Sequence, residues 1–220
     1  MVAMLTVEAV GKRYGDVMAV DSVSFSIGKG EVVGFLGPNG AGKTTTMRML
    51  TGFLPPTDGT AAIAGHDIFE ASLAARRCVG YLPEAPPLYP EMTVAAYLAY
   101  VARIKDVPRA KRRDAVERAI ERCGLTGMHR RVIGTLSKGF RQRIGLAQAI
   151  VHEPPVLILD EPTVGLDPAQ IVEIRGLIRG LAPAHTVLLS SHILPEVAKS
   201  CSRIVVVHRG RVAADDTVEG

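Results

Sequence analysis

The segment from Gly37 to Thr45 combines glycines, a lysine and hydroxyl groups at a spacing suited to binding phosphate. It fits Gly-x-x-x-x-Gly-Lys-Thr through Gly37, Gly42, Lys43 and Thr44. Glycines let the backbone curl so that several N–H groups point inward, and the following helix adds the positive end of its dipole. We expect Lys43 to reach the β- and γ-phosphates and the Thr44 hydroxyl to ligate Mg²⁺. The segment therefore predicts a nucleoside triphosphate site.

The whole loop is expected to contact the nucleotide, through Gly37, Pro38, Asn39, Gly40, Ala41, Gly42, Lys43, Thr44 and Thr45. Such loops serve kinases, GTPases and many ATPases. Asn39 is the only asparagine in the chain, and it lies inside the loop. A guanine-reading Asn-Lys-x-Asp motif is therefore excluded.

Two adjacent carboxylates, Asp160 and Glu161, follow the apolar run Val156–Leu159. Since a parallel strand ends at the carboxyl edge of its sheet, we expect both side chains beside the phosphate loop. Asp160 would then hold Mg²⁺ through water, and Glu161 would orient or deprotonate the attacking water. The alternative is that the pair caps the N-terminus of a helix.

His192 ends another apolar strand, in the sequence Ser-Ser-His. That strand would end at the same edge of the sheet, so His192 could bond the γ-phosphate and respond to its presence. The other five histidines are interpreted as structural or surface residues: His66, His129, His152, His185 and His208.

An alternation of strands and helices must position these groups. A short apolar run that feeds a glycine-rich loop and then a helix is typical of a buried parallel strand, and Val32–Leu36 is such a run. Further strands are expected at Leu5–Val10, Val23–Ile27, Val156–Leu159, Val187–Leu189 and Ile204–Val207, and helices at Thr44–Thr51, Arg141–Val151 and Ala169–Leu181.

The middle of the chain is helical in pattern from Thr93 to about Arg122, with a break near Pro108. It reads as a helical subdomain inserted into the sheet domain. Four basic residues gather after the break, at Arg109, Lys111, Arg112 and Arg113. They indicate either a solvated helix face or a contact with lipid or a partner.

Composition is that of a globular chain, with 47% hydrophobic residues, 22% charged residues and a net charge of +4. The three cysteines are far apart and form no CxxC pair, so neither a disulfide framework nor a zinc site is expected. No segment resembles a signal peptide or a membrane span, and we expect the chain to be soluble by itself.

The chain resembles the ATP-binding cassette (ABC) proteins over about residues 5–215. The family signature is matched by Leu136–Phe140, directly before the expected helix Arg141–Val151. The other family motifs appear in family order: the aromatic Tyr14, the loop 37–45, Gly80–Glu84 in place of the glutamine loop, Val156–Glu161, Gly165–Pro168 and the switch histidine His192.

The resemblance implies a P-loop NTPase cassette of the α/β class, with a RecA-like parallel-sheet core, an antiparallel β subdomain and an inserted helical subdomain. It implies one domain over 1–220: core and β subdomain at about 1–85 and 155–220, and the helical signature subdomain at about 86–154. Tyr14 would stack on adenine. Two cassettes would face head to tail around two ATP molecules, with Ser137 and Gly139 contacting the γ-phosphate in trans and Asp167 connecting the two sites.

Two departures from the family pattern concern this site. Glu84 stands where the family has glutamine, which adds a charge and removes a donor, so it could ligate Mg²⁺ as well as link the metal to a membrane partner. Lys138 and Phe140 replace the commonest Gly and Gln of the signature. Ser137 and Gly139 are retained, so the expected sandwich survives.

Residues 82–94 and 162–168 are similar to those of bacterial ABC-2 type exporters, including the gliding-motility type. The resemblance therefore implies an ATPase with the cofactors ATP and Mg²⁺, at the cytoplasmic face of the membrane. Its partners would be a second cassette and transmembrane permease subunits, with no nucleic acid. One alternative is a soluble ABC ATPase that acts on nucleic acid or ribosomes. Another is a nucleotide-binding regulator without turnover, against which Asp160, Glu161 and His192 argue.

Overall fold

Two β-sheets and a group of helices make up the computed structural model, which describes residues 3–218. The strands are β1 (Ala3–Tyr14), β2 (Val17–Gly28), β3 (Val32–Leu36), β4 (Asp58–Ile63), β5 (His66–Asp67), β6 (Val79–Leu82), β7 (Val156–Leu159), β8 (Thr186–Ser191), β9 (Arg203–His208) and β10 (Arg211–Thr217). The α-helices are α1 (Lys43–Leu50), α2 (Ser72–Arg77), α3 (Val94–Ile104), α4 (Arg112–Arg122), α5 (Lys138–Ile150), α6 (Pro168–Leu181) and α7 (Leu194–Ala198).

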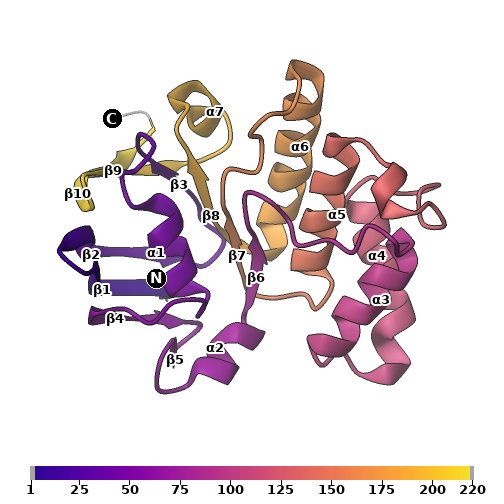
Figure 1. Ribbon diagram of the computed structural model, residues 1–220, viewed down its shortest axis with the longest axis horizontal. Helices are drawn as coiled ribbons and strands as arrows, with labels where there is room; N and C mark the ends of the chain where they lie inside the picture. The colour runs from indigo at the N-terminus through magenta and orange to yellow at the C-terminus, as the bar shows by residue number, and fades with distance from the viewer. Residues whose placement is uncertain (1–2, 219–220) are drawn as a thin grey trace.

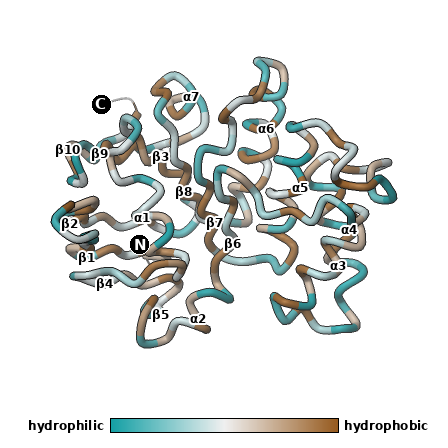
Figure 2. Tube along the Cα trace, viewed as in Figure 1, coloured by the Kyte–Doolittle hydropathy of each residue, from teal (hydrophilic) through white to brown (hydrophobic). Residues whose placement is uncertain are grey.

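The larger sheet has the strand order β10-β9-β3-β8-β7-β6, and only β10 runs antiparallel to its neighbour. Its central strands are buried on both faces because successive side chains enter two different cores. On β7, Val156 and Ile158 join the core on the side of α1, whereas Leu157 and Leu159 join the core under α5 and α6. Figure 2 shows the hydrophobic residues concentrated along these central strands.

The smaller sheet is antiparallel, in the order β2-β1-β4-β5, and its apolar side chains share one core with α1 and one face of the larger sheet. Figure 1 shows this sheet at the opposite end of the molecule from α3 and α4. The expected α/β class, with a parallel core and an antiparallel β part, is confirmed. Met47 and Met49 of α1 are completely buried in this shared core, and their burial stabilises the packing of the helix between the two sheets.

Two of the three α-helices between β6 and β7, α3 and α5, begin at hydroxyl caps, whereas α4 has no side-chain cap. Thr93 accepts a hydrogen bond from the N–H of Ala96, and Ser137 accepts one from Phe140. The expected break near Pro108 is present as a short 3₁₀ turn between α3 and α4. The predicted start of the signature helix at Arg141 is wrong, because the Ser137 cap starts α5 at Lys138.

Among residues 3–218, no helix combines the length and the apolarity that crossing a bilayer requires.

A partly buried histidine follows α5 and makes the stability of the fold depend on pH. His152 places Nε2 3.1 Å from the Val79 carbonyl oxygen, and its Nδ1 is buried without a partner. Burial, with a smaller contribution from the Lys105 charge, lowers the pKa of His152 to about 4. Burial also lowers the pKa of the nearby His185.

As the pH falls, the unfolded chain takes up a proton on His152 before the folded chain does, because the pKa is lower in the fold. The stability that the neutral histidine allows is therefore fully present above pH 6.5 and is lost as the pH falls toward 4. We expect His152→Gln to reduce the loss of unfolding free energy between pH 7 and pH 5 by roughly 2 kcal/mol. Urea unfolding at both pH values measures this. His208→Gln, at an exposed histidine, is the control, and equal pH slopes for wild type and His152→Gln would contradict the prediction.

Candidate functional site

The phosphate loop runs from the end of β3 to the first turn of α1. Gly40 and Gly42 have φ of 79° and 100°, in the left-handed region that favours glycine. A Cβ on Gly37 would lie 2.3 Å from the Val207 carbonyl oxygen, so that position has no space for a side chain. The loop therefore curls closely against β9 and leads its N–H groups into the start of the helix.

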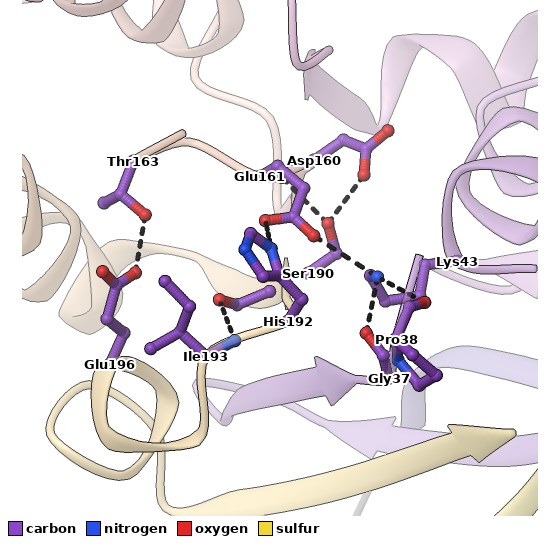
Figure 3. Close-up of polar contacts among 11 residues, drawn as sticks. Gly37, Pro38, Lys43, Asp160, Glu161, Thr163, Ser190, His192, Ile193 and Glu196 are labelled. Carbon is purple, nitrogen blue, oxygen red and sulfur yellow. Dashed lines mark hydrogen bonds and ion pairs between the residues drawn. The ribbon is translucent and has the colours of Figure 1, made fainter. Parts of the chain in front are cut away.

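Lys43 lies buried at the first position of α1. Its Nζ donates to the carbonyl oxygens of Gly37 at 2.7 Å and Pro38 at 3.2 Å, and it forms an ion pair with Glu161 Oε1 at 3.3 Å. Figure 3 shows the amine between the two carbonyl groups and the carboxylate. All three protons of the ammonium group thus have an oxygen partner, and each of these contacts can be exchanged for a phosphate oxygen.

Asp160 and Glu161 extend β7 at its carboxyl end, as the sequence predicts. Leu159 pairs with Leu189 of β8, and the N–H of Asp160 still bonds to the Leu82 carbonyl oxygen at 2.8 Å. The alternative that the two carboxylates cap a helix is wrong, because the next helix, α6, begins at Pro168 and is capped by Asp167.

The backbone at Glu161 is strained. Its φ of 47° lies in the left-handed region, which costs a side-chain-bearing residue about 1–3 kcal/mol and persists only where neighbouring contacts hold it. Here the N–H of Glu161 donates to Ser190 Oγ at 2.9 Å, and its carbonyl oxygen accepts from Val164 at 3.1 Å. The turn aims the carboxylate at α1 instead of continuing along the strand.

His192 and Lys43 hold the two oxygens of the Glu161 carboxylate. His192 Nδ1 lies 2.9 Å from Oε2, while Lys43 contacts Oε1. Because a carboxylate only accepts, Nδ1 is the nitrogen that carries the proton in this contact. The expected meeting of the ends of β7 and β8 is confirmed. The structure assigns His192 a contact that the sequence did not indicate, namely to Glu161.

A cavity of about 480 Å³ lies over the phosphate loop. Its lining includes Asn39, Gly40, Gly42, Lys43, Thr44, Thr45, Glu84, Glu161 and His192, together with Ala19 and Val164, which the sequence did not indicate. Gly37 and Pro38 do not line it, but their carbonyl oxygens accept hydrogen bonds from the Lys43 amine, which does. Ala41 is buried, and its carbonyl oxygen accepts from Gly210 at 3.0 Å, so it supports the loop from behind.

The end of β7 has the donor chemistry that a magnesium ion requires, although Asp160 itself is not among the residues that line the cavity. Asp160 is 1% exposed, its Oδ1 accepts from the Ser190 hydroxyl at 2.6 Å, and its Oδ2 is buried without a partner. A carboxylate oxygen without a protein partner suits Mg²⁺, which binds through one or two protein oxygens plus phosphates and water. Thr44 and Glu84 line the same cavity.

The signature residues lie elsewhere. Neither Ser137 nor Gly139 is among the described residues that line the cavity, and Ser137 is exposed at the start of α5. A Cβ on Gly139 would lie 2.7 Å from the Gln170 side chain of α6. A side chain at this position would therefore displace the end of Gln170, a flexible side chain that can move aside. The structure does not bring these two residues to the chain's own phosphate loop.

Tyr14, expected to stack on adenine, lies at the end of β1 and is 47% exposed. It does not line the cavity as the structure describes it. The Lys12 amine lies 5.6 Å from the centre of its ring. The ring is thus open to a flat ligand on the surface beside the loop, and its contact with adenine remains a prediction.

Comparison with known proteins places these features in one family. Residues 20–164 match the family described as "ABC transporter". The chain is 39% identical over 210 residues to the uncharacterized ABC transporter ATP-binding protein YxlF of Bacillus subtilis (strain 168), which covers 96% of the chain and 70% of YxlF. It is 39% identical over 215 residues to Nod factor export ATP-binding protein I of Burkholderia orbicola (strain AU 1054), covering 97% of the chain and 71% of that protein.

Solved structures agree with the arrangement of the sheets and helices. The structure of cbiO1 from Clostridium perfringens, described as part of the ABC transporter complex cbiONQ, superposes with a TM-score of 0.89. The two sequences are 29% identical, over 99% of this chain and 89% of cbiO1.

Proposed function

This chain belongs to the ABC transporter family, whose cassettes bind and hydrolyse ATP, and we propose that it powers a membrane exporter of the ABC-2 type. The observation that carries the proposal is the three-way contact of Lys43, Glu161 and His192 beside the phosphate loop. Export is supported by the similarity to the Nod factor export protein and by residues 82–94 and 162–168.

The proposed chemistry is in-line attack of water on the γ-phosphate. The loop N–H groups and the helix dipole of α1 bind the phosphates, and Lys43 exchanges its carbonyl partners for phosphate oxygens. Glu161 accepts a proton from the water, while His192 keeps the carboxylate in place. Asp160 and Thr44, with Glu84 beside them, would hold Mg²⁺, which neutralises charge on the phosphates when bound.

We propose that a second copy of the chain completes each site. Ser137 is exposed, lies outside its own phosphate cavity, and caps a helix whose positive end faces solvent. Such an end suits a phosphate that another cassette presents. ATP would join two chains head to tail, and hydrolysis would release them, with Asp167 at the interface between the two sites.

The proposed receiver of this motion is a permease that docks on the helical part of the chain, residues 86–154. A groove of about 840 Å³ runs between α3 and α4, and its lining combines apolar side chains with charged ones of both signs: Arg109, Arg112, Arg113, Glu117 and Glu121. Such docking would hold the cassette at the cytoplasmic face of a membrane. Residues 1–85 and 155–220 would form the catalytic part of the single domain, although residues 1, 2, 219 and 220 lie outside the described part.

Isolation of the native complex tests the function. A tagged chain expressed in its own cell should co-purify with a polytopic membrane protein in mild detergent, and reconstitution of the pair should give ATP-dependent transport. Recovery of ribosomes or nucleic acid in place of a membrane protein would support the alternative that the chain is a soluble ABC ATPase.

Glu84→Ala is expected to lower transport by the reconstituted pair about tenfold and to raise the Mg²⁺ concentration needed for half-maximal ATPase activity. The reason is that Glu84 lines the phosphate cavity and begins the segment that leads into α3. Glu91→Ala, at an exposed glutamate of the same segment that does not line the cavity, is the matched control. Unchanged transport and Mg²⁺ dependence in Glu84→Ala would contradict a role in linking metal to permease.

A further inference from the structure

One buried hydroxyl group contacts both carboxylate residues of the site. Ser190, on β8, is fully buried. Its Oγ accepts the N–H of Glu161 at 2.9 Å and donates to Asp160 Oδ1 at 2.6 Å. Figure 3 shows it between the two residues. Because the peptide N–H can only donate, the single hydroxyl proton is left for Asp160, so the direction of both bonds is fixed.

We propose that Ser190 is a positioning residue that sets the orientation of both acidic side chains at once. For Asp160, the bond to Oδ1 fixes the plane of the carboxylate and leaves Oδ2, buried and without a protein partner, as the oxygen offered to a cation. A bond from a hydroxyl to a charged carboxylate is among the stronger protein hydrogen bonds.

For Glu161, the same hydroxyl holds a peptide group whose φ of 47° is unfavourable for glutamate. His192, two residues after Ser190 on the same chain segment, holds the carboxylate of Glu161 at 2.9 Å. The end of β8 therefore fixes Glu161 at two points, at its backbone and at its side chain. Loss of the Ser190 contact frees the peptide and turns the carboxylate away from Lys43.

This inference rests on the proposed function, in which Asp160 binds Mg²⁺ and Glu161 accepts a proton from water. A nucleotide-binding measurement tests the positioning role of Ser190 separately from the proposed function, because binding needs no turnover. ADP affinity is measured by calorimetry with excess EDTA and then with Mg²⁺, in wild type, Ser190→Ala and Ser190→Thr. An inactive wild type that still binds ADP more tightly with Mg²⁺ would overturn the proposed function alone.

Ser190→Ala should bind ADP in EDTA within about twofold of wild type, because the phosphate loop is untouched. Its gain in affinity on adding Mg²⁺ should be smaller by about tenfold to a hundredfold, the range for losing a hydrogen bond to a charged group. Its kcat should fall by a similar factor. Ser190→Thr retains the hydroxyl and should restore most of the Mg²⁺ gain.

Ser191→Ala is the matched control, since Ser191 is the neighbouring buried serine and its hydroxyl bonds the N–H of Ile193 instead. It should keep the full Mg²⁺ gain. If Ser190→Ala fails to fold, Ser190→Cys, of similar size but with a weak donor, should fold and show the same loss. Equal losses of ADP affinity with and without Mg²⁺, or an unchanged Mg²⁺ gain, would overturn the positioning role.

Discussion

Replacing Glu161 with glutamine is expected to lower steady-state ATP turnover by roughly 10²–10⁴-fold and to hold two chains together as an ATP-bound dimer. Glutamine has the shape of glutamate but cannot take a proton from water. The N–H of residue 161 still reaches Ser190, and the amide oxygen still accepts from Lys43. The amide NH2 then faces His192, so this histidine must move its ring proton from Nδ1 to Nε2 to keep the contact.

The arrest is expected at the chemical step and not at binding. Lys43 and the phosphate loop remain, so ATP still binds and still brings two cassettes together. Phosphate release in single-turnover and steady-state assays measures the first effect, and size-exclusion chromatography with ATP and with ADP measures the second. Glu117→Gln makes the same chemical change on the exposed face of α4, and it should turn over at the wild-type rate.

A monomeric Glu161→Gln chain with wild-type turnover would contradict both parts. It would mean that Glu161 does not accept the proton from water and that its replacement does not stabilise the ATP-bound dimer. A stable dimer with normal turnover would contradict the role in proton transfer alone.

The central strands and the phosphate loop were predictable because each depends on a local pattern. A run such as Val156–Leu159 is apolar throughout since both faces of its sheet are covered, and it ends at the edge where Asp160 begins. By contrast, β10 is polar and mostly exposed, and α2 has only six residues, so neither carries a periodic apolar signal. Serine is a common N-cap residue, but Ser137 was assigned to the signature motif, so the helix was expected to begin only after that motif.

The contacts that organise the site depend on register between strands far apart in sequence. In the sequence, Ser190 is one of several polar residues near a strand end. The pairing of Leu159 with Leu189 places Ser190 beside Asp160, and this register is known only from the structure. The link from His192 to Glu161 arises in the same way, from a turn at Glu161 whose positive φ no residue type announces. Sequence thus predicted which groups meet, while the bonds between them required the packed sheet.

The second large effect is expected at Ser137, where aspartate should reduce turnover by at least about a hundredfold. Ser137 is exposed, caps α5 and lies outside the phosphate cavity of its own chain. Aspartate caps helices as well as serine does, so the fold should be kept, while its charge would oppose a phosphate presented by the partner. Ser137→Asn also caps, without the charge, and separates the electrostatic effect from the loss of the hydroxyl.

Mixing two inactive variants decides whether the signature acts on its own chain or on a partner. Lys43→Ala removes the phosphate-binding amine and should be inactive by itself, as should Ser137→Asp. In a mixed dimer, the Lys43 of the Ser137→Asp chain faces the Ser137 of the Lys43→Ala chain, so one site is intact. An equal mixture should recover up to about a quarter of the wild-type rate, because half of the dimers are mixed and half of their sites are whole.

If the signature served its own chain, every site in the mixture would lack either Lys43 or Ser137, and no activity would return at any ratio. A chain carrying both changes, mixed with either single variant, is the control that should stay inactive under both arrangements. Recovery in the first mixture alone would therefore establish that the loop at Gly37–Thr45 is half of a site, completed by the capped end of α5 from a second chain.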